Sequence, residues 1–476
     1  MRQLLAQLKD NDADRRLEAV KMLQPMLSFI DLGRCCLGPC PVHEQIGILD
    51  VPDALPKLID VLGDPEPDIR AEAAELLSSC GPYAAPAVPR LTEMLSNRQT
   101  ARQSLVALAA VGPAAASSLP EVRKKLQDLD PQIRMAAVQA VWNIGGDSAV
   151  LDTCSSLLAL EDPRRSGLLD FMRERMGVRA APVVPTLIRM LDSPGPYGGD
   201  PHGQVRTNCI RLLGAIGPPA KAAIPSLIRL AGDNNLRYWC IPALGQMGPA
   251  AKDAVPLLVK SLAALDSRAQ FSFENTATIQ AVGNIGPAAA AAIPNLIAQL
   301  PGGNGWAAID ALGKIGSPAA NADLELLLAN KDLCVPAALA KWRIRHNPQS
   351  LNILIEALKS DSLNAAPALA EMGPDGKAAA SALRSLLRTD SRLANASTAE
   401  ALWRVAGDRA ALDWLEKTMR VNTPSSPAAA AALWRINRRA EAKAYLIRAQ
   451  FQSATHDEAH RLIAHLGPSF YWPKPN

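Results

Sequence analysis

The dipeptide Gly-Pro recurs along this chain of 476 residues at intervals of about thirty residues. Glycine tolerates the left-handed backbone that ends a helix, and proline suits the first turn of the next helix. Each copy therefore predicts a joint between two helices. The copies are Gly81-Pro82, Gly112-Pro113, Gly217-Pro218, Gly248-Pro249, Gly286-Pro287, Gly373-Pro374 and Gly467-Pro468, with degenerate equivalents at Gly145, Gly177, Gly316, His346, Gly407 and Asn437.

A second proline recurs seven residues after the first, and it defines the first helix of each unit. It stands at Pro89, Pro120, Pro185, Pro225, Pro256 and Pro294. The residues that follow it place apolar side chains on one helical face, as in the stretch AIPSLIRL at 223–230. The pattern predicts an amphipathic first helix whose axis bends at this proline.

The second helix of a unit begins at an apolar–arginine pair, eleven residues before the joint. The pairs are Ile69-Arg70, Ile133-Arg134, Val205-Arg206 and Leu236-Arg237, and Asp64, Asp128 or Asp200 precedes three of these arginines by six residues. An aspartate in the turn can accept amide hydrogens at a helix start, and a repeating arginine can pair with carboxylates. We interpret these residues as a structural ladder.

Two short helices cannot bury their apolar faces alone, so neighbouring units must stack. The repeat predicts an all-α fold, an α-α superhelix of about thirteen helix pairs. The predicted organisation is an N-terminal capping segment at 1–47, a repeat solenoid at 48–467 and a tail at 468–476.

The joints, together with closing motifs such as ALGQMGP (243–249) and AVGNIGP (281–287), resemble HEAT repeats. The short form is similar to the phycobilisome-lyase-type HEAT-like repeats. The resemblance covers about Ile48 to Gly467 and implies a HEAT-like α-solenoid with an extended interaction surface. It implies no particular reaction.

Composition narrows the function classes. Fifty Lys+Arg against 46 Asp+Glu leave a net charge of +4, which is too small to favour a nucleic-acid protein. The charged N-terminus lacks the apolar stretch of a secretory signal, so we expect a cytoplasmic protein. The uncharged stretch 275–309 is interrupted by glycines and prolines, and we expect no membrane span there.

Tryptophan replaces the glycine of the closing motif in four units, at Trp142, Trp342, Trp403 and Trp434, and Arg343, Arg404 and Arg435 follow three of these. Stacked units would align these side chains as a ladder that binds a peptide or a phosphate-bearing ligand. In the alternative interpretation, the tryptophans fill space between units and the arginines are solvated.

Two units carry insertions between their first and second helices, at Ser193–Gly203 and Ala264–Thr276. Because both occupy the same place in their units, they should project from one edge. Their aromatic residues Tyr197, Phe271 and Phe273 are candidate partner contacts, although idle surface loops are the alternative.

Cysteines and histidines offer two candidate metal sites. Cys35, Cys36, Cys40 and His43 lie together in the sequence, but their spacing differs from paired C-x-x-C zinc knuckles, and we favour a cap with reduced cysteines. His456 and His460 lie one helical turn apart, but Glu458 falls one position away from the place of the zincin base. We therefore predict no metal and no cofactor.

The sequence thus predicts a non-catalytic scaffold or adaptor that recognises another protein or peptide through its concave face and one loop edge. Two alternatives stay open: a lyase-subunit-like or chaperone-like protein that assists cofactor attachment, and a nucleic-acid-binding HEAT-like protein. The partner, the biological process and the oligomeric state are not predicted.

Overall fold

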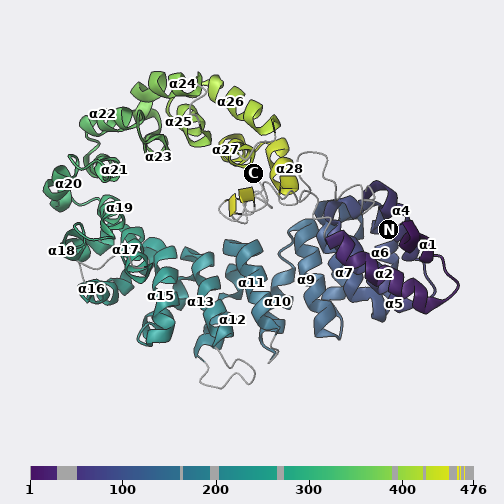
Figure 1. Cartoon of the computed structure of the whole chain (residues 1–476). Helices are drawn as coiled ribbons and strands as arrows, with labels where there is room; N and C mark the ends of the chain where they lie inside the picture. Colours follow the sequence, from purple (N-terminus) through teal and green to yellow (C-terminus); the bar gives the residue numbers. More distant parts are fainter. Residues whose placement is uncertain are drawn as a thin grey trace. The chain divides into compact units, whose positions relative to one another are not determined.

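The computed structural model describes residues 2–28, 51–160, 164–192, 203–264, 273–388, 395–421 and 425–449, together with 458, 459, 461, 462 and 466. The chain divides into two compact units. Unit 1 comprises Met1–Phe171 with Gln450–His456, and unit 2 comprises Met172–Ala449 with Asp457–Asn476. All regular elements of the described residues are helical (Figure 1). Both predicted boundaries of the repeat region, at 47 and 467, fall outside these residues.

Unit 1 consists of antiparallel helix pairs. In several pairs the first helix combines short 3₁₀ segments, labelled η, with an α-helix. Its elements are α1 (Arg2–Gln7), α2 (Ala13–Ser28), α4 (Val51–Val61), α5 (Pro67–Ser79), η1 (Gly81–Ala87), α6 (Val88–Glu93), η2 (Met94–Ser96), α7 (Arg98–Val111), η3 (Gly112–Ser118), α8 (Leu119–Lys124), η4 (Lys125–Gln127), α9 (Pro131–Gly145), α10 (Val150–Leu158) and α11 (Arg165–Phe171).

Unit 2 continues the same alternation, after a π-helical segment labelled η5. Its elements are η5 (Met172–Met176), η6 (Gly177–Val183), α12 (Val184–Asp192), α13 (Gln204–Ile216), η7 (Pro218–Ala223), α14 (Ile224–Leu230), α15 (Asn234–Gln246), η8 (Gly248–Ala254), α16 (Val255–Ala263), α17 (Phe273–Ile285), η9 (Gly286–Ala292), α18 (Ile293–Ala298), α19 (Gly305–Ile315), η10 (Pro318–Ala320), α20 (Asn321–Leu327), α21 (Cys334–Arg345), α22 (Pro348–Ala357), α23 (Ser362–Met372), η11 (Gly373–Ala379), α24 (Ala380–Arg388), α25 (Ala396–Ala406), α26 (Arg409–Arg420), α27 (Ser426–Asn437) and α28 (Ala440–Ala449).

The described helices form about thirteen pairs, from α1–α2 to α26–α27, and α28 follows them. Within unit 2 the second helices pack on one another in order, α13 on α15, α15 on α17, α17 on α19 and α19 on α21. Figure 1 shows the first helices α16 to α26 along the outer side of this stack and the second helices α17 to α27 along its inner side. The predicted all-α solenoid is confirmed.

The predicted joints are confirmed at the glycines of the described Gly-Pro pairs, which have positive φ angles, for example 70° at Gly112 and 74° at Gly217. Two degenerate joints were placed one residue too early. The left-handed residues are Gly146 and Arg438, because the helices that carry Trp142 and Trp434 continue for one more residue before they end.

The second proline does not lie within a continuous first helix, as the sequence predicted. A 3₁₀ segment follows the joint, and the proline occupies the first turn of a separate α-helix, as Pro89 does in α6. Proline is tolerated there because the first amides of a helix have no partner inside the helix. In several units the backbone departs from helical angles inside the 3₁₀ segment, for example at Ala115 (φ −88°, ψ 16°), and not at this proline.

The glycine of the closing motif allows neighbouring second helices to approach closely. A Cβ atom built on Gly245, Gly283 or Gly313 would lie 2.6, 2.7 or 2.8 Å from the Cα atom of Ala281, Ala311 or Ala340 in the next second helix. Gly214 meets Ala243 in the same way, at 2.9 Å. We call these four contacts the Gly–Ala seam. No side chain larger than hydrogen fits at these glycines without moving a backbone.

The repeated arginine is structural, but its acceptor differs from the predicted carboxylate. Arg134 Nη1 donates to the carbonyl oxygens of Asp128 at 2.8 Å and Leu129 at 3.1 Å. Arg70 contacts the carbonyl of Asp64 in the same way, and Arg237 that of Ala231. The arginine therefore binds carbonyl groups of the turn that joins the two helices of its unit.

Two helical stretches, Arg98–Gln127 and Asn275–Ala298, are long and apolar enough to cross a membrane by length and composition. Half of each apolar window is buried inside the structure, and Gly112 or Gly286 divides each stretch at a joint. These features fit helices that pack within a repeat.

We predict that Gly283→Ala lowers the melting temperature. Alanine ordinarily stabilises a helix relative to glycine by about 1 kcal/mol. Here its methyl group would press on the backbone of α19, and overpacking costs about 1–3 kcal/mol. Gly167→Ala in α11 is the matched control, because a Cβ there meets nothing within 4 Å. Thermal unfolding should show a lower melting temperature for Gly283→Ala and a higher one for Gly167→Ala. A higher melting temperature for Gly283→Ala would contradict close packing at the Gly–Ala seam.

We also predict that Arg134→Met destabilises the protein by about 1–2 kcal/mol, since two carbonyls lose a charged donor while the apolar stem is kept. Arg123→Met is the control, because the exposed pair of Arg123 with Asp147 should contribute less than about 1 kcal/mol. Urea unfolding of the full chain measures both. If both variants lose the same free energy of unfolding, the carbonyl contacts of Arg134 contribute no more to stability than the exposed pair of Arg123.

Candidate partner-binding surface

The predicted tryptophan ladder consists mainly of core residues. Trp142 and Trp434 are buried, and Trp342 and Trp403 are partly buried against the hydrophobic core of unit 2. The carbonyl group of each accepts the amide hydrogen of the residue that ends its helix, for example His346 for Trp342. Their burial fits a packing role, and contact of Trp342, Trp403 and Trp434 with a partner stays a prediction.

The arginines that follow the tryptophans occupy equivalent positions on α21, α25 and α27, but they are not simply solvated. Arg343 binds Glu371 of α23 through Nε at 2.6 Å and Nη2 at 2.7 Å. Its Nη1 donates to Asp310 of α19 at 2.7 Å. One arginine thus connects three consecutive second helices, and its side chain is only 16% exposed.

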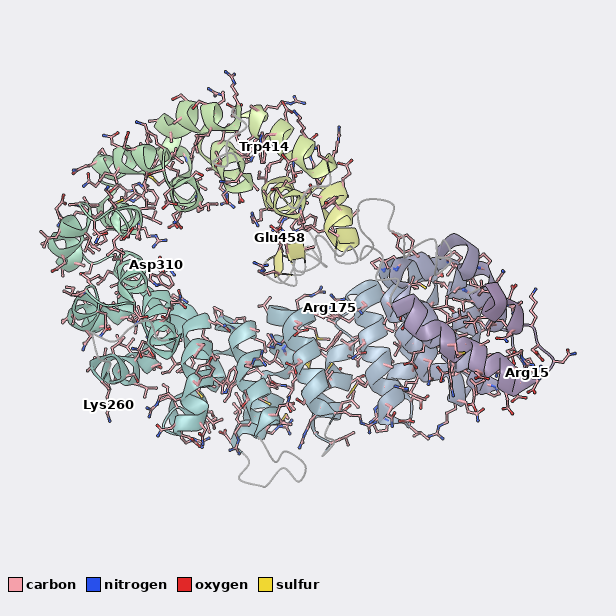
Figure 2. All side chains as sticks on the ribbon, in the orientation of Figure 1. Arg15, Arg175, Lys260, Asp310, Trp414 and Glu458 are labelled. Atoms are coloured by element: carbon pink, nitrogen blue, oxygen red, sulfur yellow. The ribbon has the colours of Figure 1, made fainter. Side chains whose placement is uncertain are left out.

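Asp310 is shared by two cations, because Lys314 of the same helix also binds it at 2.8 Å. Burial tends to raise the pKa of Asp310, but the hydrogen bonds from Lys314 and Arg343 outweigh burial and hold the pKa below its usual 3.8. Burial likewise opposes the charge of Arg343, yet Glu371 and Asp310 raise the pKa of its guanidinium. This group of four residues contains two positive and two negative charges. Figure 2 shows Asp310 on the inner side of unit 2.

Arg404 and Arg435 form a different group around one buried carboxylate, Glu400 of α25. Arg404 binds Glu400 Oε1 from the same helix, with Nη2 at 2.9 Å, and Arg435 of α27 binds Oε2, with Nη2 at 2.7 Å. The arginine side chains are 46% and 35% exposed, whereas that of Glu400 is 11% exposed. The sequence pattern identified both arginines but not the carboxylate that orients them.

Three exposed apolar residues recur on alternate second helices. Tyr238 on α15, Trp306 on α19 and Leu363 on α23 each stand ten residues before the joint glycine of their unit. The equivalent residue Thr276 of α17 is buried and donates a hydrogen bond to Asn304. We call the three exposed residues the apolar row. No motif of the sequence marks these residues, but their common distance of ten residues from the joint glycine is a signal that locates them.

Unit 1 contains a small cavity between α7, α9 and the end of α10. It holds about 130 Å³, with Arg102, Arg164 and Arg165 above an apolar wall that includes Met135 and Leu157. Pockets for small organic ligands usually exceed about 300 Å³. The cavity is therefore too small to enclose a substrate of ordinary size.

Several predicted candidates lie outside the described residues: Tyr197 and Phe271 of the inserted loops, and Cys35, Cys36, Cys40 and His43. Phe273 begins α17, but its side chain is also outside the described set. Among the residues that the structure describes, no three His, Cys, Asp or Glu side chains are grouped as metal ligands would be. Burial raises the pKa of the Cys154 and Cys240 thiols to about 12, so both stay protonated near neutral pH.

Residues 184–272 match the family model for HEAT repeats. No curated protein matches the chain. Solved structures that resemble it include importin-β (TM-score 0.49, 12% identity, covering 99% of this chain and 77% of that one) and yeast importin-β (0.46, 12%, 98% and 73%). An engineered protein also resembles it (0.38, 19%, 91% and 98%). At these identities and TM-scores, no property of those proteins is transferred to this chain.

We predict that Arg343→Gln lowers the free energy of unfolding by about 1–2 kcal/mol near neutral pH, because Asp310 and Glu371 lose a shared partner. The depressed pKa of Asp310 means that its ionic contribution is complete above pH 3.8 and is lost as the pH falls further. The difference from the unaltered protein should therefore shrink in strong acid.

Arg345→Gln is the control for this prediction, since Arg345 is an exposed residue of the same helix. It should change stability by less than about 0.5 kcal/mol. Chemical unfolding at several pH values measures both variants. If the free energy of unfolding of Arg343→Gln is lower by the same amount at every pH, the ionic explanation is contradicted.

Proposed function

We propose that this protein is a non-catalytic repeat scaffold that recognises another protein through the inner surface of its second helices. The observation that carries the proposal is the recurrence of exposed apolar side chains at one register of the alternate second helices α15, α19 and α23. The apolar row supplies large apolar groups, and the exposed Arg404 of α25 and Arg435 of α27 add charged ones. Large exposed apolar residues in a regular array are typical of a protein-binding surface.

The chemistry of the described residues supports binding more than catalysis. The arginines of the surface are tied to carboxylates and the cavity of unit 1 is small. The resemblance to phycobilisome-lyase-type repeats and a cytoplasmic location remain part of the proposal as expectations from the sequence. The inserted loops at 193–203 and 264–276 are proposed as a second contact at one edge.

The experiment compares proteins captured from a cell extract by the immobilised full chain and by two triple variants. One variant is Tyr238→Ser, Trp306→Ser and Leu363→Ser, which removes the apolar row. The control is Leu129→Ser, Leu326→Ser and Val421→Ser, which removes three exposed apolar residues outside the second helices.

We expect quantitative mass spectrometry to show a set of captured proteins that is lost with the first variant and kept with the control. Apolar contacts at interface centres often contribute 2 kcal/mol or more, so the loss should exceed about tenfold. Equal capture by both variants, with unchanged melting temperatures, would contradict recognition through this surface.

A further inference from the structure

We propose that Arg404 and Arg435 form a binding site for an acidic peptide segment. This inference rests on the proposed function, since it names the chemistry of a partner at the same surface. The site lies on α25 and α27, whereas the apolar row lies on α15, α19 and α23.

The two guanidinium groups are positioned before any ligand arrives. Glu400 accepts from Nε and Nη2 of both arginines, and Nη1 of each takes no part in the contact. Because α25 packs on α27, the shared carboxylate holds the two cations beside each other. A ligand therefore does not have to order two long side chains, which lowers the entropic cost of binding.

The site keeps a positive charge that the neighbouring ionic group lacks. Arg404 and Arg435 together carry two positive charges against the single negative charge of Glu400. Around Arg343, by contrast, Asp310 and Glu371 balance Arg343 and Lys314. Arg343 is also the least exposed of the three arginines. An anionic ligand is therefore favoured at Arg404 and Arg435, which flank Glu400, and not at Arg343.

The surroundings strengthen the positive potential. Residues 395–449 contain nine Lys+Arg and five Asp+Glu, an excess of four that equals the net charge of the whole chain. Arg438 lies over the ring of Trp434 at 5.2 Å, and Lys443 at 5.7 Å. These cations attract an anionic partner before contact and increase the rate of association.

A peptide fits this charge pattern better than a nucleic acid. A long polyanion that followed the second helices toward α19 would meet the charge-balanced group around Arg343, which offers it no net attraction. A peptide can place a few acidic side chains at α25 and α27 and neutral ones elsewhere. Carboxylates and phosphoryl groups both match the fork of an arginine, so the anion is a glutamate, aspartate or phosphorylated side chain.

The test measures fluorescence anisotropy of the full chain with a labelled peptide of alternating glutamate and alanine. A second peptide has glutamine in place of glutamate and tests whether binding needs negative charge. A third peptide has phosphoserine in place of glutamate and compares the phosphoryl group with the carboxylate. We expect binding of the glutamate or the phosphoserine peptide, with an affinity that falls as salt rises, and none of the glutamine peptide.

The variants are Arg404→Gln and Arg435→Gln, each of which leaves Glu400 with one arginine and should keep the fold. Each should weaken the Kd about three- to tenfold, since one charge-assisted contact is lost. Arg343→Gln is the matched control and should change the Kd less than twofold, although it lowers stability.

Three results would overturn the site: equal binding of the glutamine peptide, equal loss with Arg343→Gln, or tighter binding of a DNA duplex that Arg404→Gln abolishes. Failure of this test leaves the apolar-row capture unaffected. If the apolar-row variant captures the same proteins as its control while the acidic peptide still binds, recognition through the apolar row is contradicted. The acidic-peptide site is then kept.

Discussion

The structure of unit 2 depends on how closely one second helix can approach the next. At the Gly–Ala seam the backbones nearly touch, because neither residue has a side chain beyond a methyl group. Glycine inside a helix costs about 1 kcal/mol relative to alanine. Closer packing over the length of the helix offsets this cost through many small dispersion contacts. Where tryptophan replaces the glycine in α21, α25 and α27, its side chain belongs to the hydrophobic core or packs against it.

The change from glycine to tryptophan coincides with a change in the polar contacts. Along α17 and α19 a lysine reaches across to the neighbouring helix, as Lys314 does to Asn284. From α21 onward, arginines with longer reach connect the second helices through carboxylates. Arginine suits these bridges, since its planar fork binds two oxygens at once. Packing and charge therefore vary together along the surface that we propose for recognition.

The repeat unit could be derived from the sequence because its signals are local. A glycine with positive φ and a proline at a helix start are each required by backbone geometry at one position. The errors arose where a joint lacks the dipeptide. Arg438 ends α27 in a left-handed conformation that glycine would favour, and no local rule selected it over Asn437. The partners of Arg343 and Arg435 lie about thirty residues away, so their pairing depends on the stacking geometry and could not be predicted from spacing alone.

The Gly–Ala seam also constrains how such a chain can lengthen. The units of α15, α17 and α19 each offer a glycine to the following unit and an alanine to the preceding one, so both halves of the contact are encoded within one repeat. A tandem duplication of the unit that carries α15, α17 or α19 would therefore recreate a matched interface at both of its borders. A unit with tryptophan at that position lacks the glycine half of the contact, so its duplication would not recreate the seam. Growth and loss of repeats should consequently be tolerated in the glycine-bearing part and resisted in the tryptophan-bearing part.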